Sequence, residues 1–417
     1  MQFNKALKHT IIFKSLNTAF TFAINILLVR LLGADRSGQF FYAVTVLSFV
    51  TLVTGLCLEN GITYYISRHP MAAMALTGYI AAALLVQAFI SWFVIVQLHL
   101  SLPVTYQLLL VVSLLAINYF AALLTSRKWI VPVNSIVCTI NFVTAGILFF
   151  LYFSNAHIVT INEVPAIYIA SFVLQALLLI IVFFFYSRND VVQKKRDAVK
   201  VITRFSLMVF AANLLYFLMT RIDYYFVEKH CTPAGLSNYI QASKLGQLFL
   251  LVPLMAGTIL FPYTSGGNVA AMATVTKRLC RIMVTLFAIA AVIIAATGYW
   301  LFPWLFGAAF SEMYIPMLLL LPGILCLMIV TVISAYLDGI NQLKTGITAN
   351  VITLLIIAVA DWLLIPVYGI NAAAAISTVG YFICMLVTVH TFLKASGGNW
   401  AELLLITKND VKNIMKE

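Results

Sequence analysis

Twelve long apolar segments joined by short connections constrain the fold more than any other feature of this sequence. A helix of about 20 apolar residues spans the hydrocarbon core of a membrane. Hydrophobic residues make up 63% of the 417 residues and charged residues 9%, against about 45–50% and 25% in soluble domains. A soluble fold is therefore excluded, and no alternation of polarity indicates β-barrel strands. The predicted spans are 10–33, 38–63, 72–98, 102–126, 130–153, 164–187, 204–228, 236–263, 279–303, 313–338, 344–367 and 371–393.

Basic residues fall almost entirely in every second connection. Nineteen of the 25 Lys and Arg lie in the termini and the even-numbered connections, four lie within segments, and the opposite connections hold Arg36 and Lys229. Cytoplasmic loops carry an excess of Lys and Arg. We therefore expect both termini in the cytoplasm, with residues 395–417 forming an amphipathic tail at the cytoplasmic interface.

The longest polar connection divides the chain into two sets of six segments. It forms a basic cytoplasmic linker at 188–203, between an expected N-terminal lobe at 1–187 and a C-terminal lobe at 204–394. A weak internal repeat supports the division, since 38–42 and 235–239 both read GxxxY after a short outward turn. The predicted fold is an all-α membrane protein of twelve helices in two six-helix lobes, related as in transporters with parallel repeats.

Polar side chains form a stripe along the first segment. At 100° per residue, they fall within an arc of about 100° on one helix face. Polar contacts between helices would explain the stripe, but a water-filled cavity is favoured because packing alone does not satisfy a lysine inside a membrane. Near the outward end, Arg30 fits cavity lining and snorkelling to the interface equally well. The stripe consists of Thr10, Lys14, Asn17, Thr18, Thr21 and Asn25.

The segment 204–228 repeats this pattern in the second half. Arg221 points well away from Asp223, because positions two apart do not share a helix face, so each needs another partner. Lys244 lies in the next segment, which a short turn makes an antiparallel neighbour. We therefore predict an ion pair between Asp223 and Lys244. The shared face carries Ser206, Asn213, Tyr216, Thr220, Asp223 and Tyr224.

Three acids lie inside the apolar segments, namely Glu59, Asp223 and Asp361. They fit either a proton or sodium site or charge compensation for nearby Lys and Arg, and compensation is favoured.

Several classes of site and function are not expected. The six cysteines show neither metal-ligand nor disulfide spacing, so no metal or other cofactor is predicted. The net charge of +12 is spread between the segments, which gives no nucleic-acid surface. HExxH, GxSxG and P-loop motifs are missing from the sequence, and the outward loops are too short for a catalytic pocket. We therefore expect a transporter and not an enzyme.

A series of short motifs resembles the polysaccharide flippases along essentially the whole chain. Each motif is unspecific alone, but six occur in the family's order. In the last one, Asn371 replaces the usual glycine. The matching stretches are RLLG at 30–33 with GQF at 38–40, ENGI at 59–62 with Arg68, DYY at 223–225 with GLSNYIQASK at 235–244, Phe261-Pro262, LFG at 305–307 with Phe310, and LIPVYGINAA at 364–373.

The resemblance implies a Wzx-type flippase of the multidrug/oligosaccharidyl-lipid/polysaccharide exporter superfamily. Such proteins enclose a central cavity between two lobes. The implied activity is flipping of undecaprenyl-pyrophosphate-linked oligosaccharide across the bacterial inner membrane by alternating access, with membrane lipids and other polysaccharide-assembly proteins as partners. A drug or small-cation antiporter of the same superfamily is one alternative, although four intramembrane bases against three acids disfavour it. A membrane polysaccharide polymerase or ligase is the other, and the short outward loops argue against it.

This cargo would need cations for its pyrophosphate and amide or hydroxyl groups for its sugars. Lys14 and Lys244 are the leading candidates for binding the headgroup. The full set of expected substrate-binding residues is Lys14, Asn17, Thr21, Asn25, Arg30, Asn213, Tyr216, Arg221 and Lys244.

Overall fold

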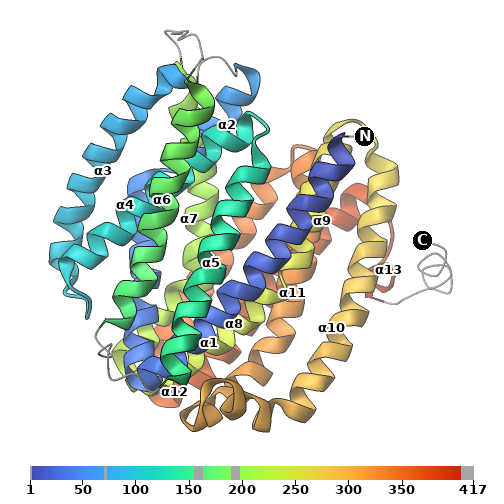
Figure 1. The fold of residues 1–417 in the computed structure, drawn as a ribbon. Helices are drawn as coiled ribbons and strands as arrows, with labels where there is room; N and C mark the ends of the chain where they lie inside the picture. The colour runs from blue at the N-terminus through green and yellow to red at the C-terminus, as the bar shows by residue number, and fades with distance from the viewer. Residues whose placement is uncertain (1, 70–72, 155–162, 189–197, 405–417) are drawn as a thin grey trace. The chain divides into compact units, whose positions relative to one another are not determined.

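The computed structural model describes residues 2–69, 73–154, 163–188 and 198–404, and within them every regular element is a helix (Figure 1). The chain forms two compact units, Met1–Leu214 and Leu215–Glu417. Their boundary lies inside the helix α7 (Ala198–His230), so this helix contributes its first half to unit 1 and its second half to unit 2.

Unit 1 is a helical bundle in which α1 packs on α5, while α4 packs on α2, α3 and α6. Its helices before α7 are α1 (Gln2–Gly55), α2 (Leu58–Arg68), the 3-10 turn η2 (Met74–Leu76), α3 (Thr77–Leu98), α4 (Val104–Ser126), α5 (Ile130–Phe153) and α6 (Val164–Ser187).

Unit 2 is organised around α11, which packs against α8, α9, α10 and α12 and is largely buried. Its elements after α7 are α8 (Pro233–Leu248), α9 (Leu251–Ser265), α10 (Val269–Phe306), the 3-10 turn η3 (Ala308–Met313), α11 (Tyr314–Gly339), α12 (Leu343–Ser396) and the short α13 (Ala401–Leu404).

Two helices are too long to be single spans. Both α1 and α12 contain 54 residues, or about 81 Å at 1.5 Å per residue, whereas the hydrocarbon core is about 30 Å thick. Each is divided by a glycine with a positive φ, Gly33 (φ 74°) in α1 and Gly369 (φ 63°) in α12. Glycine adopts such angles without the steric penalty of a side chain, so these two residues mark turns between consecutive spans.

The number of spans follows from these turns. Among the described residues, nine helices are long and apolar enough to cross a membrane, or ten when α8 and α9, bent by 41°, form one span. When α1 and α12 are each divided at their glycine, the number of spans rises from ten to twelve, which is the number predicted from the sequence.

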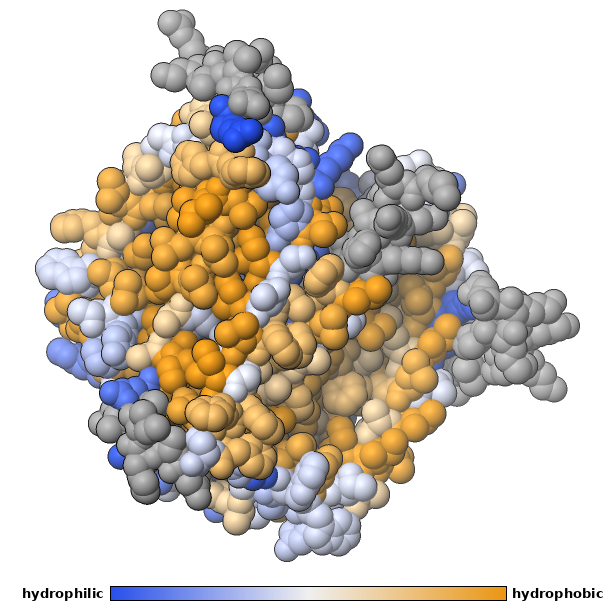
Figure 2. Space-filling view, viewed as in Figure 1, coloured by the Kyte–Doolittle hydropathy of each residue, from blue (hydrophilic) through white to orange (hydrophobic). Residues whose placement is uncertain are grey.

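Large apolar side chains cover much of the visible surface (Figure 2). Phe89 on α3 is 68% exposed and Trp304 on α10 is 71% exposed. Exposed apolar patches of this extent are uncommon on soluble monomers, but they are the expected surface of helices that face lipid.

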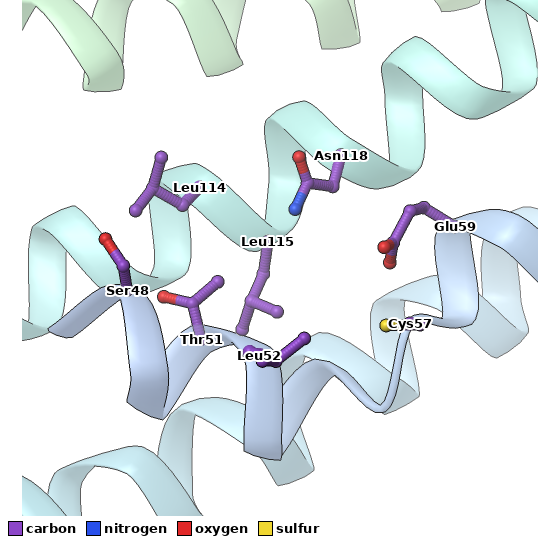
Figure 3. A pocket seen from close by; sticks show the side chains of 8 residues that line it. All are labelled: Ser48, Thr51, Leu52, Cys57, Glu59, Leu114, Leu115 and Asn118. Carbon is purple, nitrogen blue, oxygen red and sulfur yellow. The ribbon is translucent and has the colours of Figure 1, made fainter. Parts of the chain in front are cut away.

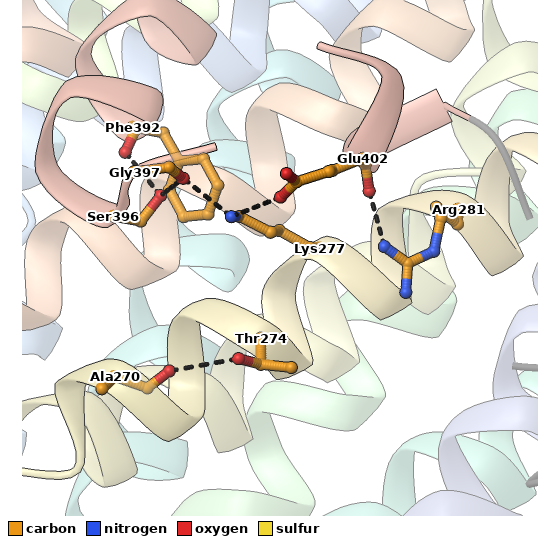
Figure 4. Close-up of polar contacts among 8 residues, drawn as sticks. All are labelled: Ala270, Thr274, Lys277, Arg281, Phe392, Ser396, Gly397 and Glu402. Carbon is orange, nitrogen blue, oxygen red and sulfur yellow. Dashed lines mark hydrogen bonds and ion pairs between the residues drawn. The ribbon is translucent and has the colours of Figure 1, made fainter. Parts of the chain in front are cut away.

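After α12 the chain folds back onto the beginning of α10 (Figure 4). The Nζ atom of Lys277 lies 2.7 Å from a carboxylate oxygen of Glu402 and donates to the backbone oxygen of Gly397 at 2.7 Å. Arg281 donates to the backbone oxygen of Glu402 at 2.6 Å, and Leu403 is buried. These contacts hold α13 on unit 2, while the rest of the predicted amphipathic tail, 405–417, lies outside the described residues.

We predict that this contact loosens in acid. The hydrogen bond and positive charge of Lys277 hold the pKa of Glu402 below its ordinary value, which is about 4.3. A lowered pKa in the folded state means that the ion pair stabilises the contact above that ordinary value and is lost as pH falls through the lowered one. Spin labels at Thr274→Cys and Trp400→Cys should give a narrower distance distribution at pH 7 than at about pH 3.5.

Glu402→Gln is the matched control for this experiment, because it removes the charge and keeps the shape. It should show a broadened distribution at both pH values. Equal distributions at the two pH values in the parent protein, or no broadening in Glu402→Gln, would show that the ion pair does not hold the tail.

Candidate functional site

The polar face of α1 contacts two other helices of unit 1. The Nδ2 atom of Asn141 on α5 donates to Oδ1 of Asn17 at 2.7 Å and lies 3.5 Å from the hydroxyl of Thr21. Gln175 on α6 donates to Oδ1 of Asn141 at 3.1 Å. Part of the predicted stripe is therefore satisfied by packing between helices.

Other members of the stripe remain open to the surroundings. The side chains of Lys14 and Thr21 are exposed, and Asn25 is half-buried. A lysine inside a membrane faces water or a partner, because exposure to lipid costs several kcal/mol. Packing between helices thus accounts for Asn17, while Lys14 and Thr21 form an accessible polar edge.

Arg30 is bound to α5 near the turn at Gly33, three residues further along α1. It donates to the hydroxyl of Tyr152 at 2.7 Å, and its guanidinium carbon lies 5.6 Å from the centre of the Tyr152 ring. This contact joins α1 to α5 and combines a hydrogen bond with a cation–π interaction.

In unit 2, two cations lie close together. Arg221 on α7 donates to the hydroxyl of Tyr224 and to the side-chain oxygen of Gln247 on α8. Lys244 lies three residues before Gln247, so both share one face of α8. The charge of Arg221 acts on Lys244, and two like charges repel each other where no water screens them. The exposed ring of Tyr216 lies on α7, between one and two turns before Arg221.

Asp223 is buried in unit 2 and is bound by groups other than Lys244. The hydroxyls of Tyr239 and Ser377 both donate to its Oδ2, the second at 3.2 Å, and the backbone N–H of Tyr224 donates to Oδ1 at 2.9 Å. The predicted ion pair between Asp223 and Lys244 is therefore wrong, because hydroxyl donors on α8 and α12 satisfy the carboxylate.

Asp361 on α12 is completely buried, and in the described part of the chain neither of its carboxylate oxygens has a hydrogen-bond partner. The negative charge of Asp223 acts on it. Two neighbouring carboxylates in a low-dielectric site are not both charged unless a cation lies between them. The charge of Arg221 acts on Asp223, so compensation by a base, the favoured interpretation of the sequence, accounts for Asp223. It does not account for Asp361, which requires a proton or a bound cation.

A transition metal is a poor fit to this pair. Over the described ranges, no three or more His, Cys, Asp or Glu side chains are grouped as metal ligands. A cation at Asp223 and Asp361 would instead use oxygen donors such as Ser377, which suits a proton or a hard ion.

The remaining predicted residues lie in unit 1 beside a helix break. Glu59 is in the first turn of α2, where the amide of Asn60 donates to it at 3.1 Å. Asn213, near the end of the unit 1 half of α7, donates to the sulfur of Cys57 at 3.4 Å.

Several residues of these clusters were not predicted from the sequence. Their common signal is a polar side chain inside an otherwise apolar segment, which identifies the residue without identifying its partner. The sequence places Tyr239 in the GxxxY repeat and does not identify it as a partner of Asp223. The residues are Tyr152, Gln175, Tyr239, Gln247 and Ser377.

Known proteins resemble this chain in structure more than in sequence. No protein-family model and no curated protein sequence matches it. A multidrug resistance MATE family transporter of the MOP superfamily, in an inward-facing conformation, superposes with a TM-score of 0.70 at 12% identity, over 92% of this chain and 96% of that one. The lipid II flippase MurJ, in an inward closed conformation, superposes with a TM-score of 0.67 at 13% identity, over 93% of this chain and 90% of that one.

A third match is a MOP superfamily transporter from Pyrococcus furiosus, described as having a binding pocket of reversed polarity that suggests a different function. It gives a TM-score of 0.63 at 12% identity, over 93% of this chain and 92% of that one. This chain has the fold of the MOP-superfamily transporters. The predicted fold class, a helical membrane protein built like these transporters, is confirmed, and the fold is not that of an enzyme family.

We predict opposite stability effects at the two acids of unit 2. In sodium-free buffer at neutral pH, Asp361→Asn should stabilise the protein by about 1 kcal/mol or more, because folding then no longer requires this buried carboxyl to take up a proton. Asp223→Asn should destabilise it by about 1–3 kcal/mol, because the amide replaces one of the two acceptor oxygens by an NH2 donor and leaves part of the three donors without an acceptor. Thermal unfolding of the purified protein in detergent measures both changes.

Asp35→Asn is the control, since Asp35 is exposed, and it should leave the unfolding temperature unchanged. If Asp361→Asn destabilises the protein as much as Asp223→Asn does, then Asp361 has a stabilising partner and the account of this site is wrong.

Proposed function

We propose that this protein flips undecaprenyl-pyrophosphate-linked oligosaccharides from the cytoplasmic to the periplasmic leaflet of a bacterial inner membrane, with both termini in the cytoplasm. The observation that carries the proposal is the pair of cations, Arg221 and Lys244, in a half-buried position of unit 2. Two adjacent positive charges within a membrane protein are unfavourable alone and become favourable when an anion lies against them. A pyrophosphate has the charge and the oxygen acceptors for this role.

The polar groups of both units suit the sugar part of such a cargo. Unit 1 presents Thr21 and Asn25 beside Lys14, and unit 2 presents the exposed Tyr216. Amide and hydroxyl groups donate and accept hydrogen bonds, as sugar hydroxyls do. The isoprenoid tail needs no polar contact and can remain in lipid.

The cation pair is connected to the acid pair along one turn of α7. Arg221 binds the hydroxyl of Tyr224, and the backbone N–H of Tyr224 binds Asp223. Uptake of a proton or sodium ion at Asp223 and Asp361 would thus change the surroundings of Arg221. We propose that this connection couples ion binding to release of the anionic headgroup.

A reconstituted system tests the proposal directly. Proteoliposomes would carry a fluorescent short-chain lipid-linked oligosaccharide, and a membrane-impermeant glycosidase would digest the sugar in the outer leaflet. Flipping exposes the remaining inner-leaflet substrate, so digestion should approach completion with the protein and stop near half without it. Complete digestion in protein-free liposomes would invalidate the assay, and digestion that stops near half with folded protein would contradict the proposal.

The cation pair gives a sharper prediction. Arg221→Ala and Lys244→Ala should each lower the flipping rate about tenfold or more, as expected when a charged hydrogen bond worth about 1.5–3 kcal/mol is lost. Lys244→Arg should retain more activity than Lys244→Ala. The matched control is Lys229→Ala, since Lys229 is exposed at the end of the same helix, and it should flip at the parent rate.

The alternative cargo is a small organic cation, in line with the likeness to a MATE family transporter. In that case, ethidium efflux from the same proteoliposomes should depend on Asp223 and Asp361, and loss of positive charge at Arg221 or Lys244 should not reduce it. Ethidium transport without lipid flipping would therefore assign the protein to cation export.

A further inference from the structure

The second predicted span of unit 1 is broken within the apolar segment. Helix α1 ends at Gly55, Leu56 and Cys57 adopt left-handed φ angles of 49° and 52°, and α2 begins at Leu58. Such angles are uncommon for residues other than glycine. Non-helical backbone inside a membrane is tolerated where it is buried or lines a cavity.

A cavity of about 230 Å³ lies beside this break, between α1 and α4 (Figure 3). Liquid water occupies about 30 Å³ per molecule, so the cavity has room for a small ion with several waters. Figure 3 shows the side chains of Glu59 and Asn118 extending into the space between these helices, while Ser48 and Thr51 line it from α1.

The carboxylate of Glu59 has no basic partner in the described part of the chain. The amide of Asn60 is its hydrogen-bond partner, at 3.1 Å. The helix N-terminus at Leu58 offers a partial positive charge, which does not neutralise a carboxylate. Asn118 lies eight residues before the end of α4, or about 12 Å along the helix. The cavity thus lies well inside the helix ends, where an unneutralised charge is expensive.

The other polar groups of the cavity can accept a cation. The hydroxyls of Ser48 and Thr51 donate to the backbone oxygens of Val44 and Leu47, each at 2.8 Å. Each hydroxyl oxygen has two lone pairs, which its donated hydrogen bond does not use and which remain available to a cation. Hard cations take carboxylate, hydroxyl, amide and water oxygens as ligands, and this cavity offers all of the protein types.

We propose that this cavity binds one monovalent cation, a sodium ion or a proton, at the carboxylate of Glu59. The site belongs to unit 1 and is separate from the acid pair of unit 2. It requires no cargo, so its existence does not depend on whether the protein flips a lipid-linked oligosaccharide.

Contacts with α7 give the site a connection to the rest of the protein. Asn213 donates to Cys57 in the break, and Gly61 on α2 lies so close to Ser206 and Ile202 that a side chain there would overlap them. Helix α7 therefore holds the break and α2 together. A cation that rearranges the break would act directly on α7.

The test is cation binding to the purified protein in lipid nanodiscs, without cargo. We would measure equilibrium binding of radioactive Na⁺ and, separately, proton release on Na⁺ addition and proton uptake on acidification from about pH 8 to about pH 6, a range in which an ordinary exposed glutamate stays charged. The parent protein and Glu59→Gln are compared, so that ions held by Asp223 and Asp361 cancel in the difference. Glu228→Gln, which changes an exposed acid at the end of α7, is the control.

For a sodium site, Glu59→Gln should bind one Na⁺ fewer, or bind it at least about tenfold more weakly, as for loss of a metal ligand. For a proton site, Na⁺ binding is unchanged and Glu59→Gln takes up one proton fewer on acidification. Asn118→Ala provides a second variant, which should weaken Na⁺ binding or shift the midpoint of proton uptake. Identical Na⁺ binding and proton uptake in the parent protein and in folded Glu59→Gln and Asn118→Ala would overturn the proposal.

Discussion

The hydrocarbon core of a membrane offers no hydrogen bonds, so every polar group inside it must be satisfied by the chain, by water or by a ligand. The helices satisfy the backbone, and most buried side chains follow the same rule. Asn141 binds both Asn17 and Gln175, and Asp223 receives three donors. Among the described residues, the informative ones are Asp361, whose carboxylate oxygens have no hydrogen-bond partner, Glu59, which has no basic partner, and the neighbouring cations Arg221 and Lys244. An ion would complete the two acids, and an anionic cargo would offset the repulsion between the two cations.

The positions of these incomplete groups favour a transporter that binds both an anion and small cations. Within unit 2, residues 221–224 of α7 contact both the cationic and the acidic cluster. Within unit 1, α7 holds the helix break beside Glu59 through Asn213. This helix belongs to both compact units. It is therefore the element best placed to respond to ions and cargo together.

Hydropathy predicted most of the fold, because the length of an apolar run determines a membrane span. The predicted segments 130–153 and 164–187 have the same ends as α5 and α6. Hydropathy did not predict the break at Leu56 and Cys57, since a left-handed turn between apolar residues does not change the pattern. The hydrogen-bond partners of the polar side chains could not be predicted in the same way, because helical periodicity places a residue on a helix face without identifying the helix that it contacts. The short turn between neighbouring segments suggested a pair of Asp223 with Lys244, whereas Ser377, which contacts Asp223, is 154 residues away in sequence.

The central claim is that the exposed polar side chains inside the spans face water and not lipid. Cysteine accessibility tests it, with the six native cysteines replaced, because the thiolate that attacks a thiol reagent forms in water. Thr21 and Phe93 are both exposed in the structure, one on the polar edge of α1 and one on the apolar surface of α3. A charged, membrane-impermeant thiol reagent should modify Thr21→Cys readily and leave Phe93→Cys unmodified. Equal modification of the two, or reaction at Phe93→Cys alone, would contradict the account.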